Sequence, residues 1–186
     1  MIPPGGNTRE RNRGRAAVGG GYDGSSVRAE IEYFNIQSMG TVIDFGDLTT
    51  TTFGQKTNAA SSTRGIIALG GRTPTYVNTI EFITIASTGD SVDFGDLSSA
   101  RSSNSGLASP TRGISAGGTE PSVTNAIDFV TIATTGNSQD FGDQSQTVYG
   151  GGGGGNATRG ITMGGYHPDQ SNVIQSIQIA TRGNTV

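Results

Sequence analysis

The chain has 186 residues, a net charge of −3 and no cysteine, and these figures exclude several classes of protein. A chain of this length can bury its own core, the weak net charge gives no basis for nucleic-acid binding, and the lack of cysteine excludes disulfides and thiolate metal sites. The first twenty residues lack a signal-peptide core, and no apolar window reaches the roughly 18 residues of a membrane span, so we expect no membrane insertion.

A unit of about 48 residues recurs almost four times along the chain. Its marks are an Arg-Gly step that leads into a double glycine, and a later Asp-Phe-Gly-Asp. The first mark stands at Arg13-Gly14, Arg64-Gly65, Arg112-Gly113 and Arg159-Gly160, and the second at 44–47, 93–96 and 140–143. A constant period of this length indicates one supersecondary unit copied in tandem, each copy burying its apolar residues against its neighbours.

The chain begins with a basic segment, residues 1–12, followed by a single repeat domain, 13–186. We divide that domain into repeats at 13–63, 64–111, 112–158 and 159–186. Four arginines alternate with other residues at the start of the chain: Arg9, Arg11, Arg13 and Arg15. They are candidates for docking to a partner protein, although the alternation also suits one face of an exposed strand. Aromatic residues for base stacking are absent nearby, which argues against binding to nucleic acid.

The first copy keeps the strand patterns of 13–20 and 31–36, and the second copy shows the unit most clearly. Residues 64–71 are a short apolar run stopped by glycines, and 78–86 are β-branched and aromatic, so each predicts a strand. A third strand is predicted over 91–97. Residues 106–109 predict a fourth, which forms a hairpin with the start of the next copy. The unit therefore predicts an all-β fold of short strands.

The later copies repeat this pattern and define the ends of the domain. Strands are predicted over 112–118, 125–134, 139–143, 159–165 and 172–181. The glycine run 150–155 falls on the first strand of the fourth unit, and indicates a strand that is flexible or closely approached, or one that contacts another chain. The first copy lacks a good opening strand and the fourth lacks Asp-Phe-Gly-Asp. We therefore expect about four four-stranded units, the first and last incomplete, with unpaired edges that favour a partner.

The ordered set of glycine and aromatic marks resembles the kelch-type β-propeller repeat. The matching residues are Gly19-Gly20, Gly70-Gly71, Gly117-Gly118 and Gly164-Gly165, then Tyr33, Phe82 and Phe129, and Phe45, Phe94 and Phe141. Tryptophan is absent, and Ser176 stands where the fourth copy should have its aromatic residue. The sequence also looks like kelch-like repeats in tail and other virion proteins of bacteriophages, notably those of marine cyanobacteria. The resemblance implies a kelch-like β-propeller, or an open arc of blades.

Asp-Phe-Gly also occurs in the magnesium site of protein kinases, which needs further motifs and a mixed α/β fold. Because the tripeptide occurs three times and Lys56 is the only lysine, we interpret the motif as structural. Its Asp side chains are expected to bond turn amides, its Phe to pack between units and its Gly to supply a positive φ. The alternative is that the paired aspartates hold calcium, although they lack the spacing of a dedicated loop.

His167 is the only histidine, and it lies in a turn beside Asp169. Without a second imidazole or a thiol it cannot form an ordinary zinc site, and no serine is singled out as a nucleophile near it. We interpret it as a solvated loop residue. Some kelch propellers are copper-radical oxidases, but that resemblance would need a cysteine-linked tyrosine, which this chain lacks. We predict no enzyme activity and no cofactor.

The sequence therefore predicts a non-enzymatic structural or interaction protein of a phage virion, tail-associated and assembled in the host cytoplasm. Its partners would be other virion proteins or further copies of the chain that complete the blades. The turns 73–77, 119–124 and 167–171 differ most between copies and are candidate recognition loops. One alternative is a carbohydrate or host-receptor module that binds a host surface glycan, and another is a capsid decoration protein. The binding residues of the first alternative would be Tyr22, Tyr76, Tyr166 and His167.

Overall fold

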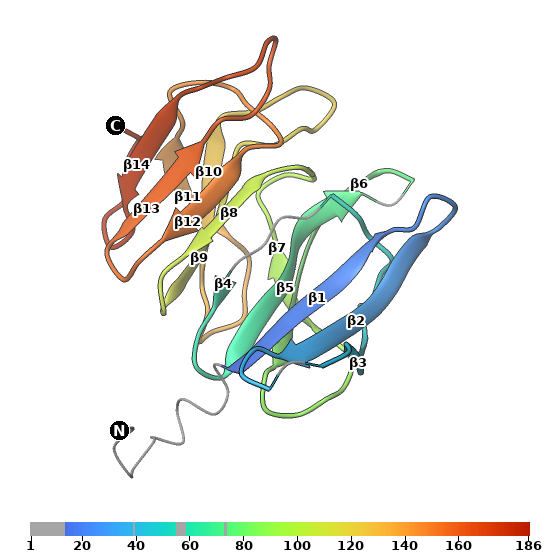
Figure 1. The fold of residues 1–186 in the computed structure, drawn as a ribbon. Helices are drawn as coiled ribbons and strands as arrows, with labels where there is room; N and C mark the ends of the chain where they lie inside the picture. Colours follow the sequence, from blue (N-terminus) through green and yellow to red (C-terminus); the bar gives the residue numbers. More distant parts are fainter. Residues whose placement is uncertain (1–13, 39, 55–58, 73) are drawn as a thin grey trace.

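A computed structural model describes residues 14–38, 40–54, 59–72 and 74–186, and every regular element in it is a β-strand. The strands form four antiparallel sheets that follow one another in a row (Figure 1). This arrangement confirms the predicted all-β class. None of the described elements is a helix long and apolar enough to span a bilayer.

The two end sheets have three strands each and the two middle sheets have four. The first sheet contains β1 (Arg15–Tyr22), β2 (Val27–Asn35) and β3 (Ile43–Asp47). The second contains β4 (Ala59–Ala60), β5 (Arg64–Arg72), β6 (Tyr76–Thr84) and β7 (Val92–Asp96). The third contains β8 (Ser105–Ala108), β9 (Arg112–Ala116), β10 (Ala126–Thr131) and β11 (Gln139–Asp143). The fourth contains β12 (Gly152–Gly155), β13 (Arg159–Met163) and β14 (Ile174–Gln178). Among the described residues the first and last sheets thus have one strand fewer than the middle ones, as predicted.

Each complete sheet is a meander whose first strand comes from the end of the preceding sequence repeat. β8 pairs with β9 as an antiparallel hairpin, which confirms the pairing predicted for 106–109. The glycine run supplies β12, which pairs with β13, and this confirms the prediction that it forms a strand. In the fourth sheet Val186 exchanges two backbone hydrogen bonds with Ser176, at 2.8 and 3.0 Å, where the third sheet has the start of β11.

The strand register corrects the alignment of the first copy. Arg15 lies opposite Asn35, as Arg64 lies opposite Thr84, so the equivalent residue is Arg15 and not Arg13. The double glycine is likewise Gly20-Gly21, with φ of +65° and +128°, and not Gly19-Gly20. Both predicted positions were wrong because three glycines follow one another here, and because β5 contains an extra residue at a bulge that changes the spacing between copies.

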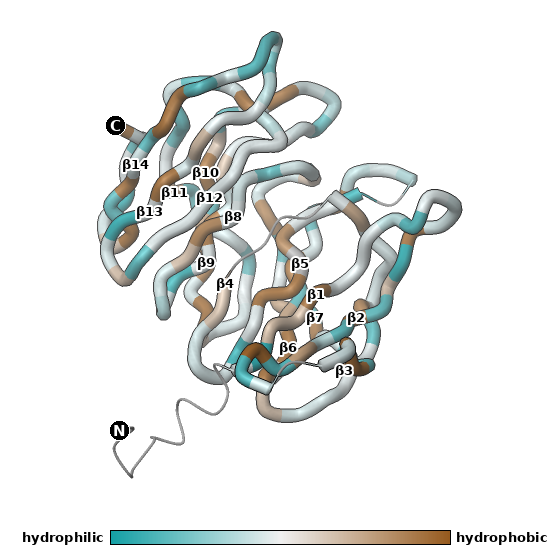
Figure 2. Tube along the Cα trace, in the orientation of Figure 1, coloured by the Kyte–Doolittle hydropathy of each residue, from teal (hydrophilic) through white to brown (hydrophobic). Residues whose placement is uncertain are grey.

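Apolar side chains pack between neighbouring sheets, and we call each such contact a joint. The first joint buries Ile31, Phe45 and Leu48 against Ile83 of the second sheet. The second joint centres on Phe82 and Phe94 with Val130 and Ile132, and the third on Phe129 and Phe141 with Ile177 and Ile179. In Figure 2 the brown, apolar segments follow the strands, while the connections at the upper edge are mostly white or teal. Each sheet is therefore stabilised sideways by its neighbours, as a repeat protein requires.

Candidate functional site

The Asp-Phe-Gly-Asp segments lie on the outer strands β3, β7 and β11, and their backbone forms part of each joint. In the first joint the Phe45 carbonyl accepts a hydrogen bond from the Gly89 amide at 2.7 Å, and the Asp47 carbonyl accepts one from Ser91 at 2.8 Å. The equivalent pairs are Phe94 with Gly136 and Asp96 with Ser138, then Phe141 with Gly183 and Asp143 with Thr185. The motif thus holds each sheet to the next one along the chain.

The glycine of this motif is required by close backbone approach. Gly46, Gly95 and Gly142 have φ between +142° and +145°, which confirms the predicted positive φ. A Cβ added to any of them would lie 2.5 to 2.6 Å from the carbonyl carbon of a glycine in the next sheet. No side chain fits there, because real Cβ atoms do not approach backbone so closely.

The predicted role of the aspartate side chains was largely wrong. Within the described part of the chain, Asp93 is the only motif aspartate whose side chain accepts a backbone amide hydrogen bond, and its donor is Gly95 of the same strand at 3.2 Å. In all three copies the motif instead donates: the backbone amide of its last aspartate donates a hydrogen bond to a side-chain oxygen in a turn of the next sheet. The three pairs are Asp47 with Asp90 at 3.0 Å, Asp96 with Asn137 at 3.1 Å and Asp143 with Asn184 at 3.0 Å.

A second side-chain contact, which the sequence reasoning missed, also crosses every joint. A buried acid or amide at the middle of the receiving sheet accepts hydrogen bonds from the second residue after the preceding outer strand. Thr49 Oγ1 donates to Glu81 at 2.8 Å, Ser98 Oγ donates to Asp128 at 2.6 Å, and the Ser145 amide donates to Gln175 at 2.7 Å. The available signal was an acid or amide just before the aromatic position in three successive repeats, although its partner lies about 30 residues earlier.

The arginine of each Arg-Gly position crosses the same joints. Arg15 donates to the Ile85 carbonyl at 2.7 Å, and Arg112 donates to the Ile179 carbonyl at 2.6 Å. Arg64 donates in the same way to Ile132 and Ala133, at 3.3 and 3.0 Å. Each guanidinium also stacks on an aromatic ring of its own sheet, at 4.7 Å for Tyr33 and 4.6 Å for Phe82 and Phe129, a cation–π geometry.

The structure describes only one of the four arginines predicted to dock a partner. Arg9, Arg11 and Arg13 lie outside the described residues. Arg15 lies at the start of β1, where its guanidinium is used within the molecule by the contacts of the first joint. A docking role for this cluster stays a prediction.

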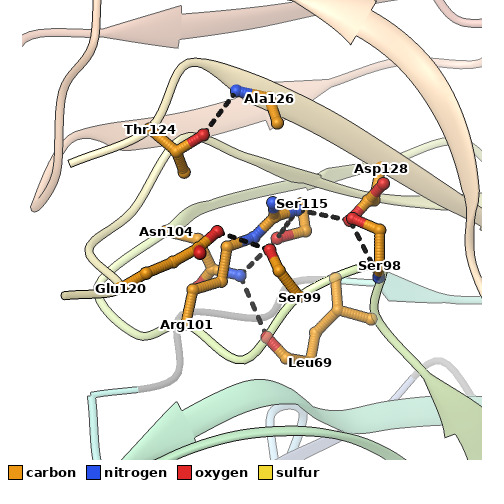
Figure 3. A network of polar contacts seen from close by, with 10 residues as sticks. All are labelled: Leu69, Ser98, Ser99, Arg101, Asn104, Ser115, Glu120, Thr124, Ala126 and Asp128. Atoms are coloured by element: carbon orange, nitrogen blue, oxygen red, sulfur yellow. Dashed lines mark hydrogen bonds and ion pairs between the residues drawn. The ribbon is translucent and has the colours of Figure 1, made fainter. Parts of the chain in front are cut away.

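The second joint contains a buried ion pair that the repeat pattern did not indicate (Figure 3). Arg101 Nη2 lies 2.7 Å from Asp128 Oδ2, and the side chains are 0% and 2% exposed. Burial lowers the pKa of Arg101, and the carboxylates of Asp128 and Glu120 act against that shift. Nearby, Asn104 donates to the Leu69 carbonyl at 2.9 Å and to the Ser115 hydroxyl. Within the described chain, Arg101 Nε and Nη1 and Asn104 Oδ1 have no protein partner.

The three predicted binding tyrosines lie on different sheets and do not contact one another. Tyr22 ends β1, is 59% exposed and packs on Phe53 with ring centroids 5.8 Å apart. Tyr76 begins β6 beneath the guanidinium of Arg72, and Tyr166 packs on Tyr149 at 5.6 Å. The turns that carry them, between β1 and β2, β5 and β6, and β13 and β14, follow the upper edge of the row in Figure 1.

His167 lies on the wall of an open polar depression of about 520 Å³, between the segment that follows β11 and the turn that joins β13 to β14. Its Nδ1 is 3.1 Å from Thr147 Oγ1, and Asp169 belongs to the same wall. In the part of the chain that the structure describes, no three acidic, histidine or cysteine side chains are close enough to hold a metal ion, and the paired aspartates do not form such a group.

Comparison with known proteins adds no family to this geometry. No family model matches the chain, and a search of curated proteins finds no significant relative.

Proposed function

We propose that the chain is a non-enzymatic structural and interaction protein of a phage virion, associated with the tail. Its four sheets would act as the blades of a kelch-like propeller or open arc. The observation that carries this proposal is the use of the repeated motif, because each Asp-Phe-Gly-Asp lies in a joint and holds the next sheet through its backbone. A row of joined sheets with variable turns along one edge is suited to presenting contact surfaces to other proteins.

The virion location follows from the resemblance of the repeats to those of phage tail proteins, and it is tested by particle fractionation. Particles of the phage that encodes the chain are banded in a density gradient, and each fraction is measured by quantitative mass spectrometry. We expect the chain to co-migrate with tail proteins at a constant ratio and to resist a high-salt wash. Recovery with tailless heads would favour capsid decoration instead, and recovery only in the soluble host fraction would refute the virion location.

Glycan binding is the second candidate, because aromatic side chains are exposed along the edge that carries the turns. Tyr22 and Tyr166 are 59% and 46% exposed, and His167 with its polar depression lies one residue after Tyr166. Each tyrosine offers an apolar ring that could stack on the apolar face of a sugar and a hydroxyl that could form a hydrogen bond to it. A glycan array probed with the full chain, and with Tyr76→Ala and Tyr166→Ala, tests this function. Binding lost in these variants but kept in Tyr33→Phe, which retains the half-buried ring of the first joint, would favour the glycan module.

An enzymatic function would need turnover that depends on a single unrepeated residue. His167 is the residue to test, since the motif residues recur at equivalent positions in three joints. Release of sugars from a host polysaccharide that disappears in His167→Ala, with the fold intact by circular dichroism, would overturn the non-enzymatic proposal.

A further inference from the structure

The free face of the first sheet exposes positions that are covered at the joints. We call this surface the receiving face and define it by Ala16, Val18, Glu32, Phe34 and Ile36. Phe34 is 37% exposed, and its equivalents by register, Ile83, Val130 and Ile177, are 3%, 3% and 5% exposed. Ile36 is 57% exposed, whereas its equivalents Ile132 and Ile179 are 0% and 1% exposed and Ile85 is half-buried. The first sheet thus presents the same kind of surface that the other sheets bury under a neighbour.

The free face of the fourth sheet exposes the opposite half of a joint. We call it the outgoing face and define it by Gly154, Ile161, Met163, Ile174 and Ser176. Ile174 is 69% exposed, and its equivalents Ile31, Ile80 and Ile127 are each 0% exposed. Met163 is 40% exposed, and its equivalents Leu69 and Ala116 are each 1% exposed. Isolated apolar residues are common on surfaces, but a set that matches a buried joint position by position indicates an interface.

The two faces are complementary where an inner strand meets the next sheet. In the second joint Ala59 faces Gly113, and a Cβ on that glycine would lie 2.9 Å from the alanine methyl. In the third joint a Cβ on Gly160 would lie 2.2 Å from Leu107 Cδ1. The second and third joints therefore each place a side chain of the outgoing sheet against a glycine of the receiving sheet.

The end faces reverse this order. The outgoing face has Gly154, and a Cβ there would meet nothing within 4 Å, while the receiving face has Ala16 at the position of Gly113 and Gly160. The methyl that one face lacks is present on the other, so the two can approach as closely as neighbouring sheets do within the chain.

A second reversal concerns the aromatic residue of each joint. At the three internal joints two rings belong to the outgoing sheet, as Phe129 and Phe141 do, and the facing residue is aliphatic, as Ile177 is. On the end faces the outgoing position is Ser176 and the receiving position is Phe34. Phe34 on the receiving side therefore supplies the volume of the one ring that Ser176 lacks on the outgoing side.

From these matches we propose that the outgoing face of one copy docks head to tail on the receiving face of a second copy. Arg159 supports this assignment, because it is exposed while its equivalents donate across the joints to the carbonyls of Ile85, Ile132 and Ile179. Its acceptor would be the Ile36 carbonyl of the second copy. This inference names a partner for the proposed docking scaffold and rests on that function only in treating the sheets as joinable units. A head-to-tail contact of this kind gives a ring if the rotation closes and a filament if it does not.

The test uses two variants of the full chain, Phe34→Glu on the receiving face and Ile174→Glu on the outgoing face. Sedimentation velocity is run from about 1 to 100 µM, a range that spans ordinary docking affinities. We expect the unaltered chain to associate and each variant to sediment as a monomer. An equimolar mixture of the two variants should form a dimer, because each variant retains the face that the other has lost.

Three results would overturn the proposal: an unaltered chain that stays monomeric throughout, a mixture that stays monomeric, or association lost in Phe34→Glu but kept in Ile174→Glu alone. The last result would mean that two receiving faces pair with each other. Phe34 and Ile174 are both exposed in the single chain, so the circular dichroism and melting of each variant should match the unaltered protein. If either variant misfolds, Arg159→Glu replaces Ile174→Glu and Ala16→Leu replaces Phe34→Glu. The assay contains only purified protein, so its result is independent of where the chain lies in a particle.

Discussion

Replacing Asp128 with alanine removes the carboxylate that faces the buried Arg101 guanidinium in the second joint. The guanidinium is fully buried, and its contact to Asp128 at 2.7 Å is the ion pair that compensates its charge there. Breaking a buried pair by removing one partner costs about 3–5 kcal/mol, because the remaining charge is left uncompensated. Set against a total stability of about 5–15 kcal/mol, the loss is large enough to measure directly.

Urea unfolding, followed by circular dichroism, measures this loss. With a slope of about 2 kcal/mol/M, Asp128→Ala should lower the unfolding midpoint by about 2 M with no change in slope. Glu32→Ala is the matched control, because Glu32 occupies the same position in the first sheet and is exposed, so we expect a change within about 0.5 kcal/mol. The double variant Arg101→Met/Asp128→Leu removes both charges together and should be much closer to the unaltered chain than Asp128→Ala is.

The double variant decides whether charge or packing explains the result. If Arg101→Met/Asp128→Leu destabilises the protein as much as Asp128→Ala, the loss comes from the shape of the joint, and the electrostatic reasoning is refuted. The same conclusion follows if Asp128→Ala and Glu32→Ala have equal effects, since only the first carboxylate has a buried cation beside it.

Three further predictions concern the joints and one turn. Arg112→Ala should destabilise the chain by about 2 kcal/mol, because it removes a charge-assisted hydrogen bond and a cation–π contact. Arg159→Ala should change the unfolding free energy by less than about 0.5 kcal/mol in dilute solution. Equal effects of the two substitutions would contradict the role of Arg112 in holding the third joint. Gly136→Ala should cost roughly 1–3 kcal/mol of stability through backbone strain alone. Gly95→Ala should cost more, because of these two positions only at Gly95 would the added methyl meet backbone of the next sheet, 2.5 Å away. Urea unfolding of the two variants compares their free energies of unfolding. Hydrogen bonds from the following turn and from an arginine lower the pKa of Asp23. The ionised side chain therefore stabilises that turn at every pH above the ordinary aspartate pKa, and this stabilisation should be lost only as the pH falls through the lowered pKa. Hydrogen exchange of the turn amides against pH measures this, and protection lost already near pH 4 would contradict it.

The sequence was sufficient for the repeat, the strand class and most strand positions. β-branched and aromatic runs stopped by glycine predict short strands locally, and the tandem period predicts that neighbouring units pack on each other. The glycine of Asp-Phe-Gly-Asp could also be assigned a positive φ from its place in a tight segment, and the three copies have it. These features depend on residues that are close together in the chain, so they can be predicted from the sequence without knowledge of the tertiary contacts.

The register of the first copy could not be settled in this way. Arg13 and Arg15 are two residues apart, and residues two apart lie on the same face of a strand, so both satisfy the pattern equally. Pairing with β2 selects Arg15, because Arg15 lies opposite Asn35.

The contacts across joints likewise belong to the tertiary structure. Thr49 and Glu81 are 32 residues apart, and Arg101 and Asp128 are 27 apart, with nothing in either local sequence to name the other. The exposed faces of the end sheets could not be predicted either, because an isoleucine at the same position of the repeat is buried in the first three copies and 69% exposed in the fourth. The repeated sequence by itself determined what each sheet is made of. The order in which sheets cover one another decided which residues are buried, because burial depends on the neighbour that covers a side chain and not on the residue alone.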